Sequence, residues 1–478
     1  MRMPAALRTG LPAAALAGLL AMAAAIALGG AIRQDYAALA LLAGAVIVLP
    51  AIVFVQRAAA WEPRAAFAMS IVLIVIQSAV FRTRDIADKS IDAQVLMKLG
   101  AIAMMALMAA TALSRIDTRR HSGDALVWFA FITYGALTSL ISVKPELALV
   151  ETFSHFAAFI LLYGMAKLLG RINTVNALIA SCFILCLMSL VAYVALPSLG
   201  RMSDWANGAF IPTSRLQGVF GTANAAGGAA GASLVLLLFL SDIPRNRPLF
   251  YALAAAFAAC LVLSNNRMAL VGVGVAALYI HLRQGNLPLK AALAVLGIGL
   301  VLFAYLGFGK ELLAELSRSG SAEEITSGTG RTQIWSVVLR LWAEQPIFGY
   351  GAGSAKYILP NQPTLFAAAA HAHDLYLNIL FSGGVIGLAL LLAGLWLALR
   401  RTIRRQDDGV VALLLFFMVY GITEPTIGSL ASFVPMGFYA AAILALPREG
   451  SALAGAGRAV VALGERRRPA APGFERPG

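Results

Sequence analysis

Long apolar runs recur along most of this chain, and they limit what it can fold into more than any other feature. An α-helix of about 20 apolar residues spans the roughly 30 Å hydrocarbon core of a bilayer. Because the shortest runs can be re-entrant or merge with a neighbour, we expect about 12–14 membrane helices. The candidate runs lie approximately at 11–32, 37–56, 66–81, 94–113, 125–142, 149–170, 175–196, 223–241, 249–264, 267–282, 289–308, 374–399, 408–424 and 428–447.

The composition agrees with a membrane protein. Hydrophobic residues make up 60% of the chain and charged residues 13%, whereas a soluble domain has about 25% charged residues. This excludes an ordinary soluble globule, a disordered chain and a disulfide scaffold. The three cysteines all lie inside apolar runs, so neither disulfides nor metal ligation is expected of them. The fold class predicted is all-α, a polytopic transmembrane helix bundle.

The net charge of +14 has a topological explanation. If the N-terminus is cytoplasmic and the runs alternate, the whole excess of Lys and Arg falls on the cytoplasmic side, as the positive-inside rule requires. No nucleic acid is needed as a partner. We therefore place both termini in the cytoplasm, and interpret the run 11–32 as a first membrane helix rather than a cleaved signal peptide.

We expect one integral membrane domain over residues 1–447, followed by a basic, Pro-rich and disordered cytoplasmic tail at 448–478. The basic run 466–468 in this tail can contact anionic membrane lipids. Two outer segments are long, at about 197–222 and 309–373. Within the second, apolar residues at helical spacing predict an amphipathic helix that lies on the membrane or caps the bundle. These apolar residues are Ile334, Val337, Val338, Leu341 and Trp342.

Two of the five histidines stand close together where the second outer segment enters a membrane helix. They are His371 and His373, and Asp374 follows directly. A neutral imidazole at such an edge can accept a proton from a hydroxyl group. A metal site built from these three residues is an alternative, although no fourth ligand is evident. A purely structural polar cap is the third interpretation.

Several arginines are expected on the outer side, close to hydrocarbon. Arg215 precedes one membrane helix and Arg267 opens another. A guanidinium group binds phosphate as a two-pronged donor. Equally, such an arginine can reach the interface or pair with an acid. Arg331 and Arg340 on the amphipathic helix are further candidates, although such a helix needs a polar face in any case.

Two other features have structural interpretations. The glycine-rich segment 349–353 is not flanked by the strand, the helix and the lysine that a nucleotide-binding P-loop has, so we interpret it as a tight loop. Glu424 lies near a helix end, where a structural pair or an interfacial position is the expected role.

These motifs together resemble those of the O-antigen ligase and polymerase family. His373, Asp374, nine further residues, Gly384, two residues and Gly387 match the spacing of its late motif, with Asp374 in place of the usual second residue. The stretches 330–335 and 346–353 are similar to its loop signature, and Arg215 and Arg267 match the places of its arginines. The resemblance is clearest over about 210–390.

The resemblance implies a metal-independent, inverting glycosyltransferase of the bacterial inner membrane that needs no cofactor. Its donor would be a glycan on undecaprenyl pyrophosphate at the periplasmic face. Arg215 and Arg267 would hold the pyrophosphate, and His373 would be the catalytic base. The expected substrate-binding residues are Arg215, Arg267, Arg331, His371 and Asp374.

The acceptor is left open by the sequence. A ligase uses lipid A–core, a polymerase uses another lipid-linked repeat, and an oligosaccharyltransferase uses a protein; the histidine motif favours the ligase. A flippase or transporter for lipid-linked glycans is an alternative of another class, and an inactive scaffold is a third. The pKa of His373 is also open, because an inward-pointing Asp374 would raise it and nearby arginines would lower it.

Overall fold

The computed structural model describes residues 54–82, 92–116, 123–206, 209–243, 246–284, 331–363, 365 and 370–447. The chain divides into two compact units, Met1–Ala445 and Leu446–Gly478. The predicted runs at 11–32 and 289–308, most of the run at 37–56, and the tail at 448–478 lie outside the described residues.

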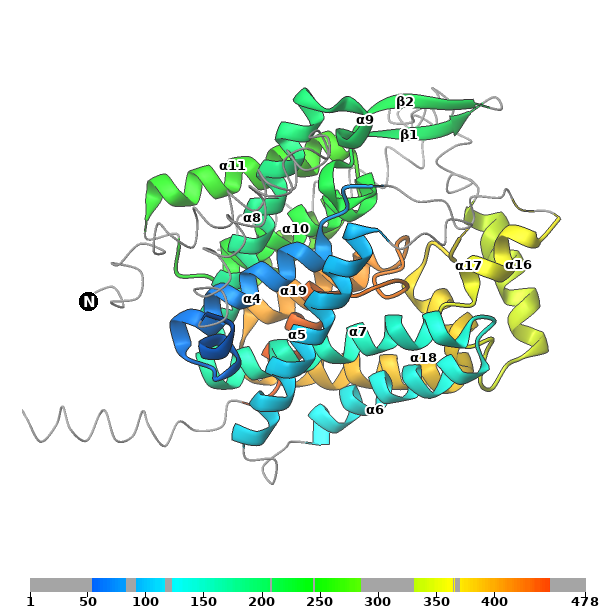
Figure 1. Ribbon diagram of the computed structural model, residues 1–478, viewed down its shortest axis with the longest axis horizontal. Helices are drawn as coiled ribbons and strands as arrows, with labels where there is room; N and C mark the ends of the chain where they lie inside the picture. The colour runs from blue at the N-terminus through cyan, green and yellow to red at the C-terminus, as the bar shows by residue number, and fades with distance from the viewer. Residues whose placement is uncertain are drawn as a thin grey trace, which may run out of the picture. The chain divides into compact units, whose positions relative to one another are not determined.

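Helices make up almost all of the regular structure in the described part of the chain (Figure 1). The helices that overlap the predicted membrane runs are α4 (Pro63–Ser78), α5 (Ala93–Arg115), α6 (Gly123–Thr138), α7 (Pro145–Gly164), α8 (Arg171–Ala195), α10 (Ala223–Phe239), α11 (Arg247–Ser264), α12 (Arg267–Gln284), α18 (Leu375–Arg404), α19 (Asp408–Tyr420) and α20 (Phe433–Leu444). The remaining α-helices are α9 (Pro197–Gly200), α16 (Arg331–Glu344) and α17 (Ala355–Ile358).

The predicted fold class is confirmed. Every predicted run that falls wholly in the described residues contains one of these helices. Among the described residues, five helical segments are long and apolar enough to cross a membrane, and five further apolar helices are shorter. The protein is therefore an all-α, multi-pass membrane bundle.

The first outer segment contains an element that the sequence analysis missed. Strands β1 (Arg201–Ala206) and β2 (Ala209–Leu216) form an antiparallel hairpin. Short strands outside the membrane have no long apolar run, so hydropathy does not reveal them. The hairpin brings Arg215 back to the bundle, because β2 ends one residue later and α10 begins soon after.

Helix α10 can approach its neighbours closely because its first half is rich in glycine and alanine. Thr222 caps the helix by accepting a hydrogen bond from the backbone N–H of Ala225 at 3.1 Å. A Cβ atom on Gly227 would lie 2.5 Å from Asn266, one on Gly228 would lie 2.5 Å from the Tyr420 hydroxyl, and one on Gly231 would lie 2.8 Å from a ring carbon of Phe416. Small residues at helix contacts allow such close approach in membrane proteins.

The bundle has two chemically different ends. At one end, Arg171 at the start of α8 forms an ion pair with Asp407, and Arg283 at the end of α12 contacts Asp408 at 3.3 Å. Helix α12 begins at Arg267 and α19 ends at Tyr420, so both of these residues lie at the opposite end. Arg171 and Arg283 thus lie at one end and Arg267 at the other, as the predicted alternation of the helices requires. The sides of the other charged residues stay a prediction. Which end faces the periplasm stays a prediction.

The predicted amphipathic helix is confirmed as α16. Its buried face consists of Ile334, Val337, Val338 and Leu341. This face packs with residues of the following loop and with Phe381 on α18. Of the two arrangements considered, the apolar face therefore covers protein rather than lying open to lipid. Helices α6 and α18 run side by side, and α16 packs against α18 (Figure 1).

Helix α18 is interrupted at Gly384, and close to this point its backbone forms hydrogen bonds with the loop that follows α16. Gly384 has φ 59° and ψ −163°, a conformation that is accessible essentially only to glycine. The carbonyl groups of Phe381 and Ser382 accept hydrogen bonds from the N–H groups of Tyr350 and Gly351, both at 2.9 Å. This packing confirms the tight-loop interpretation of the glycines at 349–353, which all have positive φ.

Gly384→Ala should destabilise the protein by at least about 1–3 kcal/mol, because the backbone angles exclude a side chain. The new Cβ would also lie 2.1 Å from the carbonyl oxygen of Ile347. Thermal unfolding in detergent checks this. Gly100→Ala in α5 is the control, because a Cβ there meets nothing within 4 Å and alanine favours a helix. Equal unfolding temperatures for the two variants would contradict the prediction.

Candidate active site at one end of the helix bundle

The two histidines of the late motif lie in the turn that leads into α18. Their ring centroids are 4.1 Å apart, with an interplanar angle of 62°. His373 has φ 50°, which is uncommon for a residue with a side chain and is often found where function requires it. The turn is held by the Trp335 indole N–H, which donates to the carbonyl of Ala372 at 3.0 Å, and by the N–H of Leu375, which donates to Gly421 at 2.7 Å.

The Asp374 side chain caps the N-terminus of α18 and does not pair with the imidazoles. Its carboxylate accepts a hydrogen bond from the N–H of Leu377 at 2.6 Å, as the N-cap of α18. Burial raises the pKa of Asp374, and backbone hydrogen bonds from Leu377 and Tyr376 act in the opposite direction. A role for Asp374 in substrate binding stays a prediction.

The electrostatic surroundings answer the question about the pKa of His373. Burial lowers the pKa of His373 to about 2, with smaller contributions in the same direction from His371 and the charge of Arg331. Burial and Arg331 also lower the pKa of His371, to about 4. Both rings are therefore neutral at pH 7. A neutral imidazole has one nitrogen free to accept a proton.

The histidine rings also carry buried nitrogen atoms that lack partners. Nδ1 of His371 and Nδ1 of His373 have no hydrogen-bond partner among the described residues. Buried polar atoms are usually satisfied, so such exceptions often have a functional reason. In the described part of the chain, no group of three or more His, Cys, Asp or Glu side chains lies close enough to hold a metal ion.

The carboxylate of Glu424 joins Arg331, the first residue of α16, to the bundle. Arg331 donates from Nη2 to Oε1 of Glu424 at 2.7 Å. The same oxygen accepts a hydrogen bond from Nδ2 of Asn224 at 2.7 Å. Glu424 lies in the connection between α19 and α20, and its side chain is only 8% exposed. From the sequence, a structural pair or an interfacial position was expected for Glu424, and the pair that it forms is with a predicted site residue.

Arg215 continues the same chain of contacts. Its Nη2 donates to Oδ1 of Asn224 at 2.8 Å, and its Nε donates to the carbonyl of Ser264 at 3.0 Å. Arg215 is buried, with 6% of its surface exposed. Its guanidinium group therefore ties the end of the hairpin to the end of α11 and to the start of α10.

Two further residues complete the support of Asn224. The carbonyl of Asn224 accepts hydrogen bonds from the Asn266 side chain and from the Tyr420 hydroxyl, both at 2.9 Å. Asn265 has φ 47°, and this conformation closes the tight turn between α11 and α12. Arg267, the next residue but one, is the first residue of α12, as expected from the sequence.

The predicted site residues are thus brought together only in part. Contacts link Arg215, Arg331 and Glu424 through Asn224, and the charge of Arg331 acts on both histidines. Arg340 is exposed on α16 and donates to Gln362 at 3.2 Å, so it belongs to a local contact. Sequence reasoning did not find the parts played by Glu424, Asn266 and Tyr420, because hydropathy and motif spacing carry no signal of contacts between distant helices.

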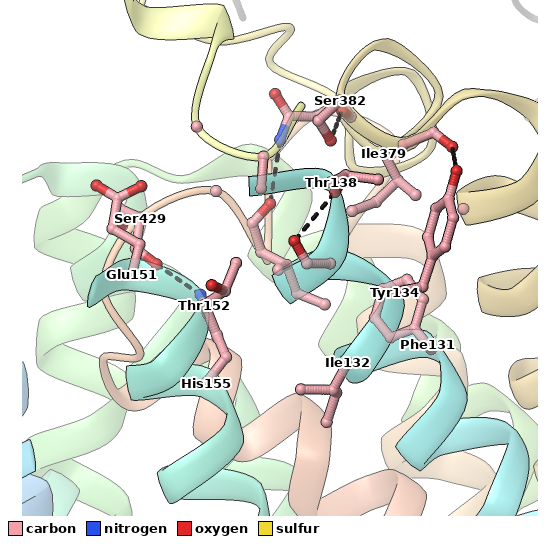
Figure 2. Close-up of a pocket in the computed structure, with 18 of the residues that line it drawn as sticks. Phe131, Ile132, Tyr134, Thr138, Glu151, Thr152, His155, Ile379, Ser382 and Ser429 are labelled. Atoms are coloured by element: carbon pink, nitrogen blue, oxygen red, sulfur yellow. Dashed lines mark hydrogen bonds between the residues drawn. The ribbon is translucent and has the colours of Figure 1, made fainter. Parts of the chain in front are cut away.

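A cavity adjoins the candidate active site, with about 650 Å³ of free space including its open mouth. Figure 2 shows residues of α6, α7 and α18 around it, and the bond between His155 and Ser429. Its wall includes Asn378, which also donates to the carbonyl of Ile427 at 3.1 Å. The cavity and the histidine turn are therefore neighbours along α18.

These features define a multi-pass helical membrane protein with neutral histidines, the buried Arg215 and the partly exposed Arg331 at one end of its bundle. A family model described as O-antigen ligase matches residues 250–392. The chain is also 26% identical over 197 residues to an O-antigen ligase of Pseudomonas aeruginosa, a match that covers 40% of this chain and 44% of the relative. The resemblance to the O-antigen ligase family is thereby confirmed over this part of the chain.

Arg331→Gln should raise the pKa values of His371 and His373, because removal of a positive charge makes the imidazolium forms less unfavourable. The protein with histidine-selective isotope labels, titrated by NMR in detergent, measures this directly. His371→Gln and His373→Gln assign the signals among the five histidines. A wild-type His373 that titrates at its ordinary value near 6.5 would contradict the electrostatic description.

Proposed function

We propose that this protein is a glycosyltransferase of the bacterial inner membrane. It moves a glycan from undecaprenyl pyrophosphate to an acceptor hydroxyl at the periplasmic face. The observation that carries the proposal is the neutral histidine pair beside Arg331, within the region that matches the O-antigen ligase family. A catalytic base and an anion-binding group are the two parts that this reaction needs.

His373 acts as the general base. Its imidazole takes the proton of the acceptor hydroxyl while that oxygen attacks the anomeric carbon of the donor. A new glycosidic bond forms on the opposite face of the sugar, and the bond between the anomeric carbon and the pyrophosphate oxygen breaks. The configuration at that carbon is therefore inverted. At neutral pH the His373 ring is neutral, so one of its nitrogens is free to accept the proton.

The arginines stabilise the leaving pyrophosphate. Its negative charge increases as the bond to the sugar breaks, and positively charged groups held in place stabilise that change. Arg331 is partly exposed, with 21% of its side chain accessible. Arg267 at the start of α12 and Arg215 near the end of the hairpin contribute further positive charge. His371 and Asp374 are the further residues that we assign to substrate binding.

We favour lipid A–core as the acceptor, which makes the protein an O-antigen ligase. The name of the Pseudomonas aeruginosa relative supports this choice. The match spans less than half of that relative, so the other acceptors are retained as outcomes of the test below. They are a second lipid-linked repeat, for a polymerase, and a protein hydroxyl, for an oligosaccharyltransferase.

Transfer in vitro should require His373. The purified protein receives undecaprenyl-pyrophosphate glycan and one acceptor in each tube: lipid A–core, a second lipid-linked glycan, or a peptide. We expect product with lipid A–core, and a loss of about 10²–10⁴-fold in kcat for His373→Ala, the range typical of a general base. Arg340→Gln, on the exposed part of α16, is the matched control and should leave the rate nearly unchanged.

The outcomes separate the classes of function. Product with one of the other acceptors identifies a polymerase or an oligosaccharyltransferase. Donor binding without product in any tube supports a flippase or a scaffold. A fully active His373→Ala variant rejects the assignment of the base, and an inactive His371→Ala variant would then move that role to the neighbouring ring.

The reaction should proceed without metal ions, because arginines supply the positive charge that a metal would otherwise provide. Transfer assays with EDTA and with added Mg²⁺ or Zn²⁺ test this. Equal rates are the expected result. Loss of activity in EDTA, restored by one added ion, would instead support the metal site considered for His371, His373 and Asp374.

A further inference from the structure

Glu424 is placed where two parts of the candidate active site meet. Its Oε1 atom lies 2.7 Å from Nη2 of Arg331 on α16 and 2.7 Å from Nδ2 of Asn224 on α10. Asn224 in turn accepts a hydrogen bond from Arg215 at 2.8 Å. A single carboxylate oxygen thus connects elements that are about 100 and 200 residues away from it in the chain.

The support of Glu424 is well defined. In the connection between α19 and α20, the carbonyl of Ile427 accepts a hydrogen bond from Asn378, and the carbonyl of Ser429 accepts one from Nε2–H of His155 at 2.6 Å. The N–H of Ala431 donates to the hydroxyl of Ser154 at 3.0 Å. Figure 2 shows the contact between His155 and Ser429. Side chains from α7 and α18 therefore hold the backbone that carries the carboxylate.

Arg331, by contrast, is the first residue of its helix and has a long side chain with many rotamers. Its bond to Glu424 connects the guanidinium group to the bundle. The opposite charges and the low exposure of Glu424 make this bond stronger than a surface ion pair. The location of the Arg331 charge beside the histidines thus depends on the carboxylate.

We propose that Glu424 is a positioning residue, which holds the guanidinium group of Arg331 next to His371 and His373 and in register with Arg215 through Asn224. This inference rests on the proposed function, because it assigns Arg331 to the leaving pyrophosphate. Glu424 itself does not touch the substrate. Its negative charge opposes the binding of an anionic donor, and the gain that offsets this cost is the alignment of Arg331 during the reaction.

The variants Glu424→Gln and Glu424→Asp distinguish charge from hydrogen bonding. Gln keeps the length of the side chain and can still accept from Asn224, but it loses the ion pair with Arg331. Asp keeps the charge and is one methylene shorter. We expect Glu424→Gln to lower kcat about 10- to 100-fold with little change in donor KM, since small misplacements of a catalytic group cost this much. Glu424→Asp should keep more activity than Glu424→Gln.

A double-mutant cycle tests whether Glu424 acts through Arg331. The double variant Glu424→Gln with Arg331→Gln should be no slower than Arg331→Gln alone, because the carboxylate has lost the group that it positions. Glu146→Gln is the matched control, since Glu146 is an exposed carboxylate in the first turn of α7. Unfolding temperatures and donor binding are measured for every variant.

Three results would overturn the inference. Effects of Glu424→Gln and Arg331→Gln that multiply would show independent roles. A Gln variant with tighter donor binding and unchanged kcat would identify Glu424 as a competitor of the pyrophosphate. Activity lost only in proportion to unfolding, equally in the Gln and Asp variants, would reduce Glu424 to a structural role. An active His373→Ala variant, whatever the result at Glu424, rejects the proposed function itself.

Discussion

Close packing against helix α10 is the constraint on which the rest of this structure depends. Gly227 and Gly228 have no side chains, so Asn266 and Tyr420 can reach the backbone of α10 and bond to the carbonyl of Asn224. Asn224 is thereby held from the turn between α11 and α12 and from α19. Its side chain is then available to connect Arg215 with Glu424, and through Glu424 with Arg331. The polar cluster exists because three helices meet without bulky residues between them.

The separation of polar groups to the two ends follows from the membrane. Charges are costly in hydrocarbon, so ionisable residues gather at helix ends and pair there. One end uses Arg171, Asp407 and Asp408 in pairs that join α8, α12 and α19. The other end holds the histidines and the remaining arginines of the site. Helix α16 packs over this end and buries apolar residues against α18. Arg331, its first residue, lies where α16 contacts the bundle.

The amphipathic helix could be predicted from residue periodicity, and the membrane helices from the length of their apolar runs, because each pattern is local. The β-hairpin at 201–216 could not, since it carries no long apolar run. Among the site residues, the histidines and Arg331 are visible as motif residues. Glu424 has the same sequence context as many interfacial acids, and only its distances to Arg331 and Asn224 show its part in the site.

The sequence by itself determined the class of protein and the residue types that can do chemistry, because hydropathy, charge and motif spacing are properties of the chain. Tertiary structure decided the rest. It placed Asp374 as a helix cap instead of a partner for His373, and it set Arg331 close enough to lower the pKa of both imidazoles. The physical reason is that electrostatic effects depend on distance and burial, and both are properties of the folded molecule.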